Sequence, residues 1–227
     1  MTSPFNARRV AVVAPHADDE ILGCGGTMAR AAAAGAQVHV VVVTRGQPPL
    51  FDEELVQVIR KETLHAHEMI GVAETHFLDF PAAGLDQVKS SDLNHAISSA
   101  LSRIEPDLLL IPFIGDIHLD HQAVFNAALV HARPRSAAVP GCVLAYETLS
   151  ETNWLAPGIT PAFIPNMFVD IGDTIERKIA AFQTFETQVK PAPDERSIEA
   201  IRALATLRGA TVHRRAAEAF VVIRQII

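Results

Sequence analysis

Cysteine, tyrosine and tryptophan are scarce in this chain, which has two cysteines, one tyrosine and one tryptophan among 227 residues. The two cysteines, Cys24 and Cys142, cannot form the set of disulfides that stabilises a small secreted domain. They also cannot supply the several thiolates that a structural zinc site usually uses. Stability must therefore come from a hydrophobic core. With 49% hydrophobic residues, the chain is long enough to form one good-sized domain, 1–227.

Clusters of basic residues and long apolar runs are also missing. The formal net charge is −7, and no group of lysines and arginines offsets it, which argues against a nucleic acid or an anionic membrane as partner. No stretch reaches the roughly 18 apolar residues of a membrane span. The first ten residues lack the apolar segment of a signal peptide. The sequence predicts a soluble, cytoplasmic protein with no membrane insertion.

Short apolar runs alternate with longer helical segments along the chain. Runs at 9–14 and 37–44 flank an alanine-rich stretch, 20–34, that ends before Gly35, as in a βαβ unit. Continuous apolar strands suit a parallel sheet that helices cover on both faces. Further strands are predicted at 75–80, 107–112, 141–147, 167–171 and 219–226, and helices at 53–70, 91–104, from 121, 173–188 and 194–207. The pattern predicts a single three-layer α/β domain with a C-terminal appendage.

A group of ionisable side chains directly follows the first predicted strand. Residues 15–20 read Pro-His-Ala-Asp-Asp-Glu, which places one imidazole and three carboxylates in a single turn. The carboxyl edge of the strands is where open α/β sheets build their sites. Such closely packed groups repel and desolvate one another unless a positive charge lies among them. A divalent metal is the simplest candidate.

A second group, residues 116–121, follows another apolar run and should lie at the same edge of the sheet. His118 and His121 are three residues apart, so at a helix start they face the same side. His16, Asp19 and His121 would then provide two imidazoles and one carboxylate. This set suits Zn²⁺ with an open position for water, and Fe²⁺ or another divalent ion suits it nearly as well.

The neighbours of this set fit the roles of a hydrolase. Asp18 is placed to accept the proton of the attacking water, and His118, as a cation, to stabilise a tetrahedral oxyanion and protonate a leaving amine. Asp116 and Asp120 fit an outer shell that orients the imidazoles. The competing interpretation is structural: Asp18 and Asp19 are helix N-caps, and His118 is an ordinary surface histidine.

Two other features favour ordinary structural roles. The glycine-rich stretch 23–26 lies where a dinucleotide could dock, but its spacing is wrong and carboxylates precede it. Its glycines are predicted to permit close packing of a helix on the sheet. The remaining histidines are scattered and are predicted to have no part in the site: His39, His65, His67, His76, His95, His131 and His213.

Residues 15–20 together with 118–121 (His-Leu-Asp-His) resemble the paired motifs of the LmbE-like, or PIG-L, family of zinc-dependent N-deacetylases. The first family motif usually reads Pro/Ala-His-Pro-Asp-Asp-Glu, and the second has two histidines with an aspartate before the last. This chain departs from the pattern at Ala17, where proline is usual, and at Gln47, where an acidic residue is common. The first departure removes no functional atom, and the second bears on substrate contacts but not on the chemistry.

The resemblance implies a Rossmann-like fold and hydrolysis of the N-acetyl group of a GlcNAc-type amino sugar, with release of acetate. The substrate expected from it is a small molecule such as a sugar nucleotide or glycoconjugate precursor. By position, His16, Asp19 and His121 match the family's zinc ligands. Asp18 matches its general base, and His118 its oxyanion-stabilising acid.

The resemblance is less specific about substrate contacts and assembly. Arg45 aligns with a basic residue near the family's substrate pocket. Relatives are often multimeric, so a homo-oligomer is compatible with the resemblance.

Two alternative functions stay open at this point. One is an amidase for a larger acyl group or a thiol S-conjugate, which requires the same metal set but a different pocket. The other is a non-catalytic, Rossmann-like module that binds a nucleotide or sugar. In such a module Asp18 and His118 would be dispensable.

Overall fold

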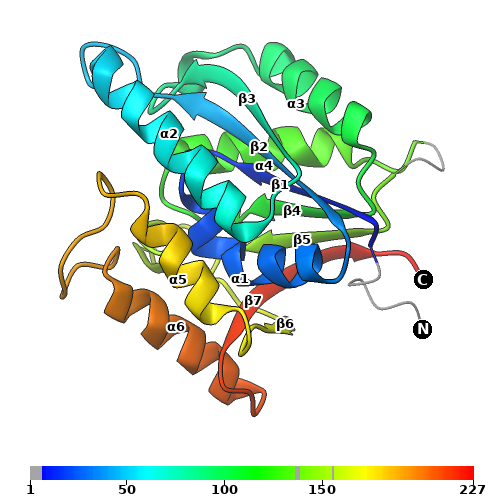
Figure 1. Cartoon of the computed structure of the whole chain (residues 1–227). Helices are drawn as coiled ribbons and strands as arrows, with labels where there is room; N and C mark the ends of the chain where they lie inside the picture. Colours follow the sequence, from blue (N-terminus) through cyan, green and yellow to red (C-terminus); the bar gives the residue numbers. More distant parts are fainter. Residues whose placement is uncertain (1–6, 136–138, 155) are drawn as a thin grey trace.

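The computed structural model describes residues 7–135, 139–154 and 156–227 and has a seven-stranded sheet at its centre (Figure 1). The strands are β1 (Arg9–Ala14), β2 (Gln37–Arg45), β3 (Glu74–Pro81), β4 (Leu108–Pro112), β5 (Cys142–Tyr146), β6 (Met167–Asp170) and β7 (Ala217–Gln225). The helices are α1 (Asp19–Ala33), α2 (Glu53–Ile70), α3 (Ser90–Ile104), α4 (Leu119–His131), α5 (Ile175–Gln183) and α6 (Ile198–Thr211).

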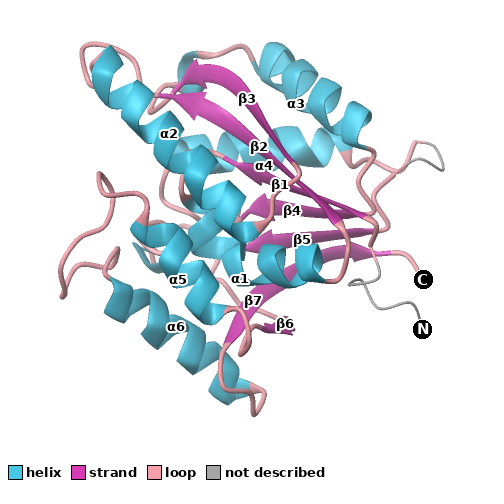
Figure 2. Cartoon of the chain, viewed as in Figure 1, coloured by secondary structure: helices cyan, strands magenta, loops and turns pink. Residues whose placement is uncertain are grey.

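Helices cover both faces of the sheet, so the predicted three-layer α/β fold is confirmed (Figure 2). Side chains alternate along β1: Val10 and Val12 pack against α1, whereas Ala11 and Val13 face α3 and α4. Both faces of the strand are buried, which explains its continuous apolar sequence. Within the described part of the chain, no helix is both long and apolar enough to cross a membrane.

The C-terminal segment extends the same sheet, whereas the sequence suggested an appendage. The strand order is β3-β2-β1-β4-β5-β7-β6, with β1 to β5 parallel and β7 antiparallel to both of its neighbours. Phe220 of β7 lies opposite Tyr146 on one side and Met167 on the other. The last two helices also differ from the prediction. One ends at Gln183, and the next begins after Ser197, whose side chain caps it by accepting from the Ala200 N–H.

The glycines of α1 allow this helix to lie very close to its neighbours. A Cβ atom on Gly23 would lie 2.3 Å from the Tyr146 ring, and one on Gly26 would lie 2.8 Å from Ile171. This agrees with the interpretation of these glycines as packing residues. This close packing fixes the position of α1 and therefore that of Asp19, its first residue.

We expect Gly23→Ala to destabilise the protein. Alanine normally favours a helix over glycine by about 1 kcal/mol, but here the clash with Tyr146 should reverse the sign and cost about 1–3 kcal/mol. Urea unfolding measures the change. The matched control is Gly141→Ala, because a Cβ there meets only a carbonyl oxygen at 3.6 Å. Equal stability of both variants would contradict the close-packing argument.

Candidate metal centre and adjoining pocket

The carboxyl ends of β1 and β4 bring the two sequence motifs together. These strands are adjacent and parallel, with Val12 opposite Leu110, so the loops that follow them leave the sheet side by side. The ring centroid of His16 lies 5.3 Å from that of His121 and 4.7 Å from that of His118. The two segments, about 100 residues apart in the sequence, therefore form one site.

Asp19 lies between two imidazoles. Its Oδ2 atom is 3.2 Å from His16 Nδ1 and 3.2 Å from His121 Nε2. The side chains of Asp19 and His121 are fully buried. The contact between them lacks hydrogen-bond geometry, so within the described residues neither Asp19 Oδ1 nor His121 Nε2 has a hydrogen-bond partner. Buried polar atoms without partners are costly unless something binds them. One ligand atom from each of the three residues lies within 4.8 Å of the other two, so the set is suited to a divalent metal.

Asp120 holds the outer side of His16. Its Oδ2 atom lies 3.0 Å from His16 Nε2 and accepts a hydrogen bond from the Ala83 N–H, while Oδ1 accepts from the Leu85 N–H. Because Nε2 of His16 is engaged in this way, Nδ1 is the nitrogen that faces Asp19. The carboxylate thus fixes both the tautomer and the orientation of the ring.

Asp116 does the same for His121. Its Oδ2 atom lies 2.9 Å from His121 Nδ1, and the Thr152 hydroxyl donates to Oδ1 at 2.6 Å. Nε2 of His121 is therefore left to face Asp19. Each of the two predicted outer-shell aspartates thus contacts one imidazole of the predicted ligand set.

The carboxylates around His16 and His121 raise the pKa of both imidazoles. Burial disfavours a charged imidazole, yet Asp19 and Asp116 outweigh burial and raise the pKa of His121 to about 10. In the same way, Asp120 and Asp19 overcome burial and raise the pKa of His16 to about 9. The carboxylates thus retain protons on the rings when no other cation is near. A divalent cation can replace those protons.

Asp18 stands at the N-cap position of α1, as the structural interpretation expected, but its side chain does not cap the helix. It has a left-handed backbone, with φ of 108°, and its side chain makes no capping hydrogen bond. Its Oδ2 atom instead accepts from Arg196 Nη1 at 3.0 Å. Burial raises the pKa of Asp18 to about 7, against the opposing charge of Arg196. Strained conformations of this kind concentrate at functional sites.

His118 is oriented by α4, the helix that its side chain caps. Its Nδ1 atom accepts a hydrogen bond from the Asp120 N–H at 3.1 Å. A ring that accepts at Nδ1 carries its proton on Nε2, and burial together with His16 lowers its pKa. The structure therefore favours a neutral hydrogen-bond donor over the cation expected from the sequence.

Sequence reasoning missed two residues that contact the first motif. His67, which seemed to be an ordinary histidine, lies on α2 with Nε2 2.9 Å from Glu20 Oε1, and Glu20 Oε2 accepts from the Asp18 N–H. Arg196 reaches Asp18 from 178 residues further along the chain. Spacing in the sequence could not reveal either residue, because both contacts depend on how α2 and the loop before α6 fold back toward the first motif.

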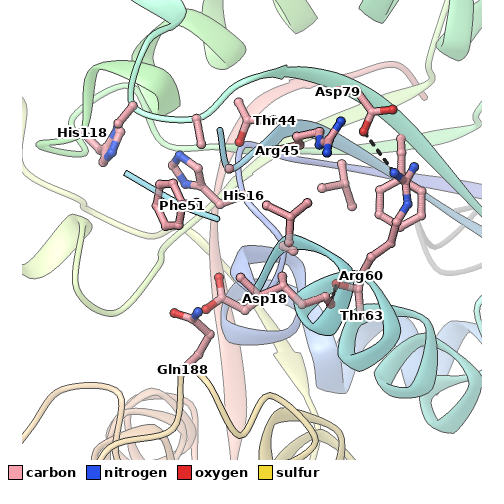
Figure 3. A pocket seen from close by; sticks show the side chains of 18 of the residues that line it. His16, Asp18, Thr44, Arg45, Phe51, Arg60, Thr63, Asp79, His118 and Gln188 are labelled. Atoms are coloured by element: carbon pink, nitrogen blue, oxygen red, sulfur yellow. Dashed lines mark hydrogen bonds and ion pairs between the residues drawn. The ribbon is translucent and has the colours of Figure 1, made fainter. Parts of the chain in front are cut away.

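A cavity of about 260 Å³ opens beside His16, Asp18 and His118 (Figure 3). The predicted substrate residue Arg45 lines it and forms an ion pair with Glu53. Much of the remaining wall is apolar and comes from β2, α2, β3 and the loop after β2, through Val42, Phe51, Val56, Ile59 and Phe77. The site thus combines a charged end with an apolar body, as small-molecule sites often do.

Comparisons with known proteins identify the family and support the fold. Residues 11–132 match the family described as PIG-L: GlcNAc-PI de-N-acetylase. The diacetylchitobiose deacetylase of Thermococcus kodakarensis is 28% identical over 207 residues, covering 83% of this chain and 73% of that protein. A conserved protein of Thermus thermophilus has a TM-score of 0.76 at 28% identity, with 96% of each chain covered. The N,N'-diacetylchitobiose deacetylase of Pyrococcus horikoshii shares the fold, with a TM-score of 0.78 at 22% identity over 98% of this chain and 86% of that one.

We expect Asp116→Asn to weaken divalent-metal affinity by about 10- to 100-fold, because the amide cannot hold the ring of His121 as a carboxylate does. Competition with a chromophoric chelator measures the affinity. The control is Asp173→Asn, which changes an exposed aspartate outside this cluster. Unchanged affinity in the Asp116 variant would show that this carboxylate does not support the metal centre.

Proposed function

We propose that this chain, which belongs to the PIG-L family and is a hydrolase acting on amide bonds, removes the N-acetyl group from a GlcNAc-type amino sugar. The products are acetate and the free amine. One observation carries the proposal: the ligand atoms of His16, Asp19 and His121 converge beside a cavity large enough for a small molecule. Zn²⁺ is the proposed metal, because two imidazoles and one carboxylate form the ligand set of many catalytic zinc sites.

The proposed metal and the chain's own residues have separate tasks. When bound, Zn²⁺ polarises a carbonyl group and lowers the pKa of water toward neutrality. Asp120 and Asp116 keep the free nitrogens of His16 and His121 aimed at Asp19. These contacts are present without substrate.

Asp18 is the proposed general base. It lines the cavity, and its contact with Arg196 holds the carboxylate at the cavity wall. There it accepts a proton from the attacking water and returns it to the nitrogen of the departing amine. The nitrogen thus leaves as a neutral amine, and the second proton of the water stays with the acetic acid, which ionises to acetate.

His118 is proposed to stabilise the oxyanion. Its Nδ1 atom is occupied by the Asp120 N–H, so its proton is on Nε2, and the ring lines the cavity. From that position Nε2–H donates to the carbonyl oxygen as negative charge develops on it. Arg45, at the same cavity, is a proposed substrate contact.

Replacing the base should separate metal binding from chemistry. We expect Asp18→Ala to retain the metal and lower acetate release by about 10²- to 10⁴-fold, because proton transfer is lost. His16→Ala should lose both metal and activity. Metal analysis together with an acetate-release assay on N-acetylated sugars and sugar nucleotides tests both variants.

The control for this pair is Asp173→Ala, an exposed aspartate that should leave both readouts unchanged. Full turnover by the Asp18 variant would refute the assigned base. A wild-type protein that binds sugars or nucleotides and releases no acetate from any of them would instead support the non-catalytic module.

The apolar wall of the cavity favours a second candidate, hydrolysis of a larger acyl group. Val56 and Ile59 offer a surface on which an alkyl chain can be buried, beside Phe77, whose ring is covered on one face by the Arg60 guanidinium at 4.0 Å. Both candidates use the same metal set, so only the acyl group distinguishes them.

A series of N-acetyl-, N-butanoyl- and N-octanoyl-glucosamine distinguishes these candidates by kcat/KM. We expect the acetyl compound to have the highest kcat/KM, because a deacetylase binds its substrate mainly through contacts with the sugar. A rise of about fourfold for each added methylene, which corresponds to about 0.8 kcal/mol, would establish the larger acyl group instead.

A further inference from the structure

Three potential metal ligands share one face of the sheet at its amino-terminal edge. His39 lies on β2, and Glu74 and His76 lie on the edge strand β3. In the parallel register, His39 is opposite Glu74, and Val41 is opposite His76. Alternate residues of a strand point to the same face, so all three side chains project to the side that α3 and α4 cover.

The distances between their ligand atoms fit a metal ion. His39 Nδ1 lies 3.4 Å from His76 Nε2, and Glu74 Oε2 lies 3.8 Å and 3.7 Å from these two nitrogens. A point equidistant from three such atoms lies about 2.1 Å from each, which matches the lengths of Zn–N and Zn–O bonds. The two nitrogens face each other in a hydrogen bond, whose proton a metal ion would replace, and the two rings lie with centroids 5.7 Å apart.

We propose that His39, Glu74 and His76 form a second binding site for a late first-row transition metal, with Zn²⁺ as the test ion. The ligand set of two imidazoles and one carboxylate is of the type that such ions prefer, and it leaves positions for water. This site is separate from the centre at His16. Thr44, at the other end of β2, lies five residues from His39, roughly 16 Å at the rise of an extended strand.

Access and charge agree with the proposal. The carboxylate of Glu74 is 61% exposed, whereas the rings of His39 and His76 are 13% and 12% exposed. An ion can therefore enter from solvent and meet two largely buried nitrogens. Burial and the neighbouring His76 lower the pKa of His39, which keeps that ring in the neutral form that binds metals. The nearby positive charge of Arg9 is paired with Glu105 at 3.5 Å.

Such an ion would stabilise the edge of the sheet. It would join β2 to β3, and β3 carries Phe77, which lines the cavity beside the metal centre. The second site would thus stabilise the strand that forms one wall of the pocket. It needs no part in the reaction.

Metal stoichiometry tests the proposal. Metal-free full-length protein is titrated with Zn²⁺ against a chromophoric chelator, and we expect two ions per chain. His39→Asn should bind one ion, and Glu74→Gln should weaken one of the two sites by more than about tenfold. His65→Asn is the matched control, because His65 also lies near a glutamate, Glu68, on an exposed helix face, and it should still bind two.

A second measurement keeps the proposal falsifiable if His39→Asn fails to fold, since Glu74 is exposed and Glu74→Gln leaves both rings in place. In a His16→Ala background, micromolar Zn²⁺ should raise the thermal unfolding midpoint, and adding Glu74→Gln should abolish that rise. One ion per chain in the wild type that is lost in His16→Ala, binding only at millimolar Zn²⁺, or two ions retained in both site variants would overturn the proposal.

Discussion

A buried carboxylate between two imidazoles, Asp19 between His16 and His121, is the interaction on which the rest of this structure depends. An ionised group in a buried position is costly unless its partners are held in place. Several groups of this chain hold Asp19 and its two partners in place. Asp116 and Asp120 hold the rings from behind, and the backbone N–H of His16 donates to Asp19 itself.

The position of Asp19 depends in turn on how α1 is docked. Close approach at its glycines is one part of this docking. The other is a buried ion pair, in which Lys178 Nζ lies 2.7 Å from Glu218 Oε1. Glu218 also accepts from the backbone N–H groups of Gly26 and Thr27, and Lys178 donates to the carbonyl of Leu22. Strand β7 and helix α5 thus bind the backbone of α1 directly, so the C-terminal part of the chain helps to fix the site at the first strand.

The carboxyl and amino ends of the strands carry two different groups of side chains. At the carboxyl edge, loops after β1 and β4 supply the charged groups, and the cavity lies between them and α2 (Figure 3). At the amino edge, histidines on β2 and β3 come together where the strands begin. Parallel strands make both arrangements available, because every strand starts at one edge and ends at the other.

The sequence by itself determined the fold class, the family and the two motifs, because buried strands, helix patterns and short-range motifs are local features. Periodicity and spacing could not reveal contacts such as Arg196 with Asp18, His67 with Glu20, or His39 with His76. Those pairs depend on strand order, register and the course of long loops. Tertiary structure also decided the tautomer of His118 and the place of β7 inside the sheet. Hydrogen bonds formed only after folding select one arrangement from several that the local sequence permits.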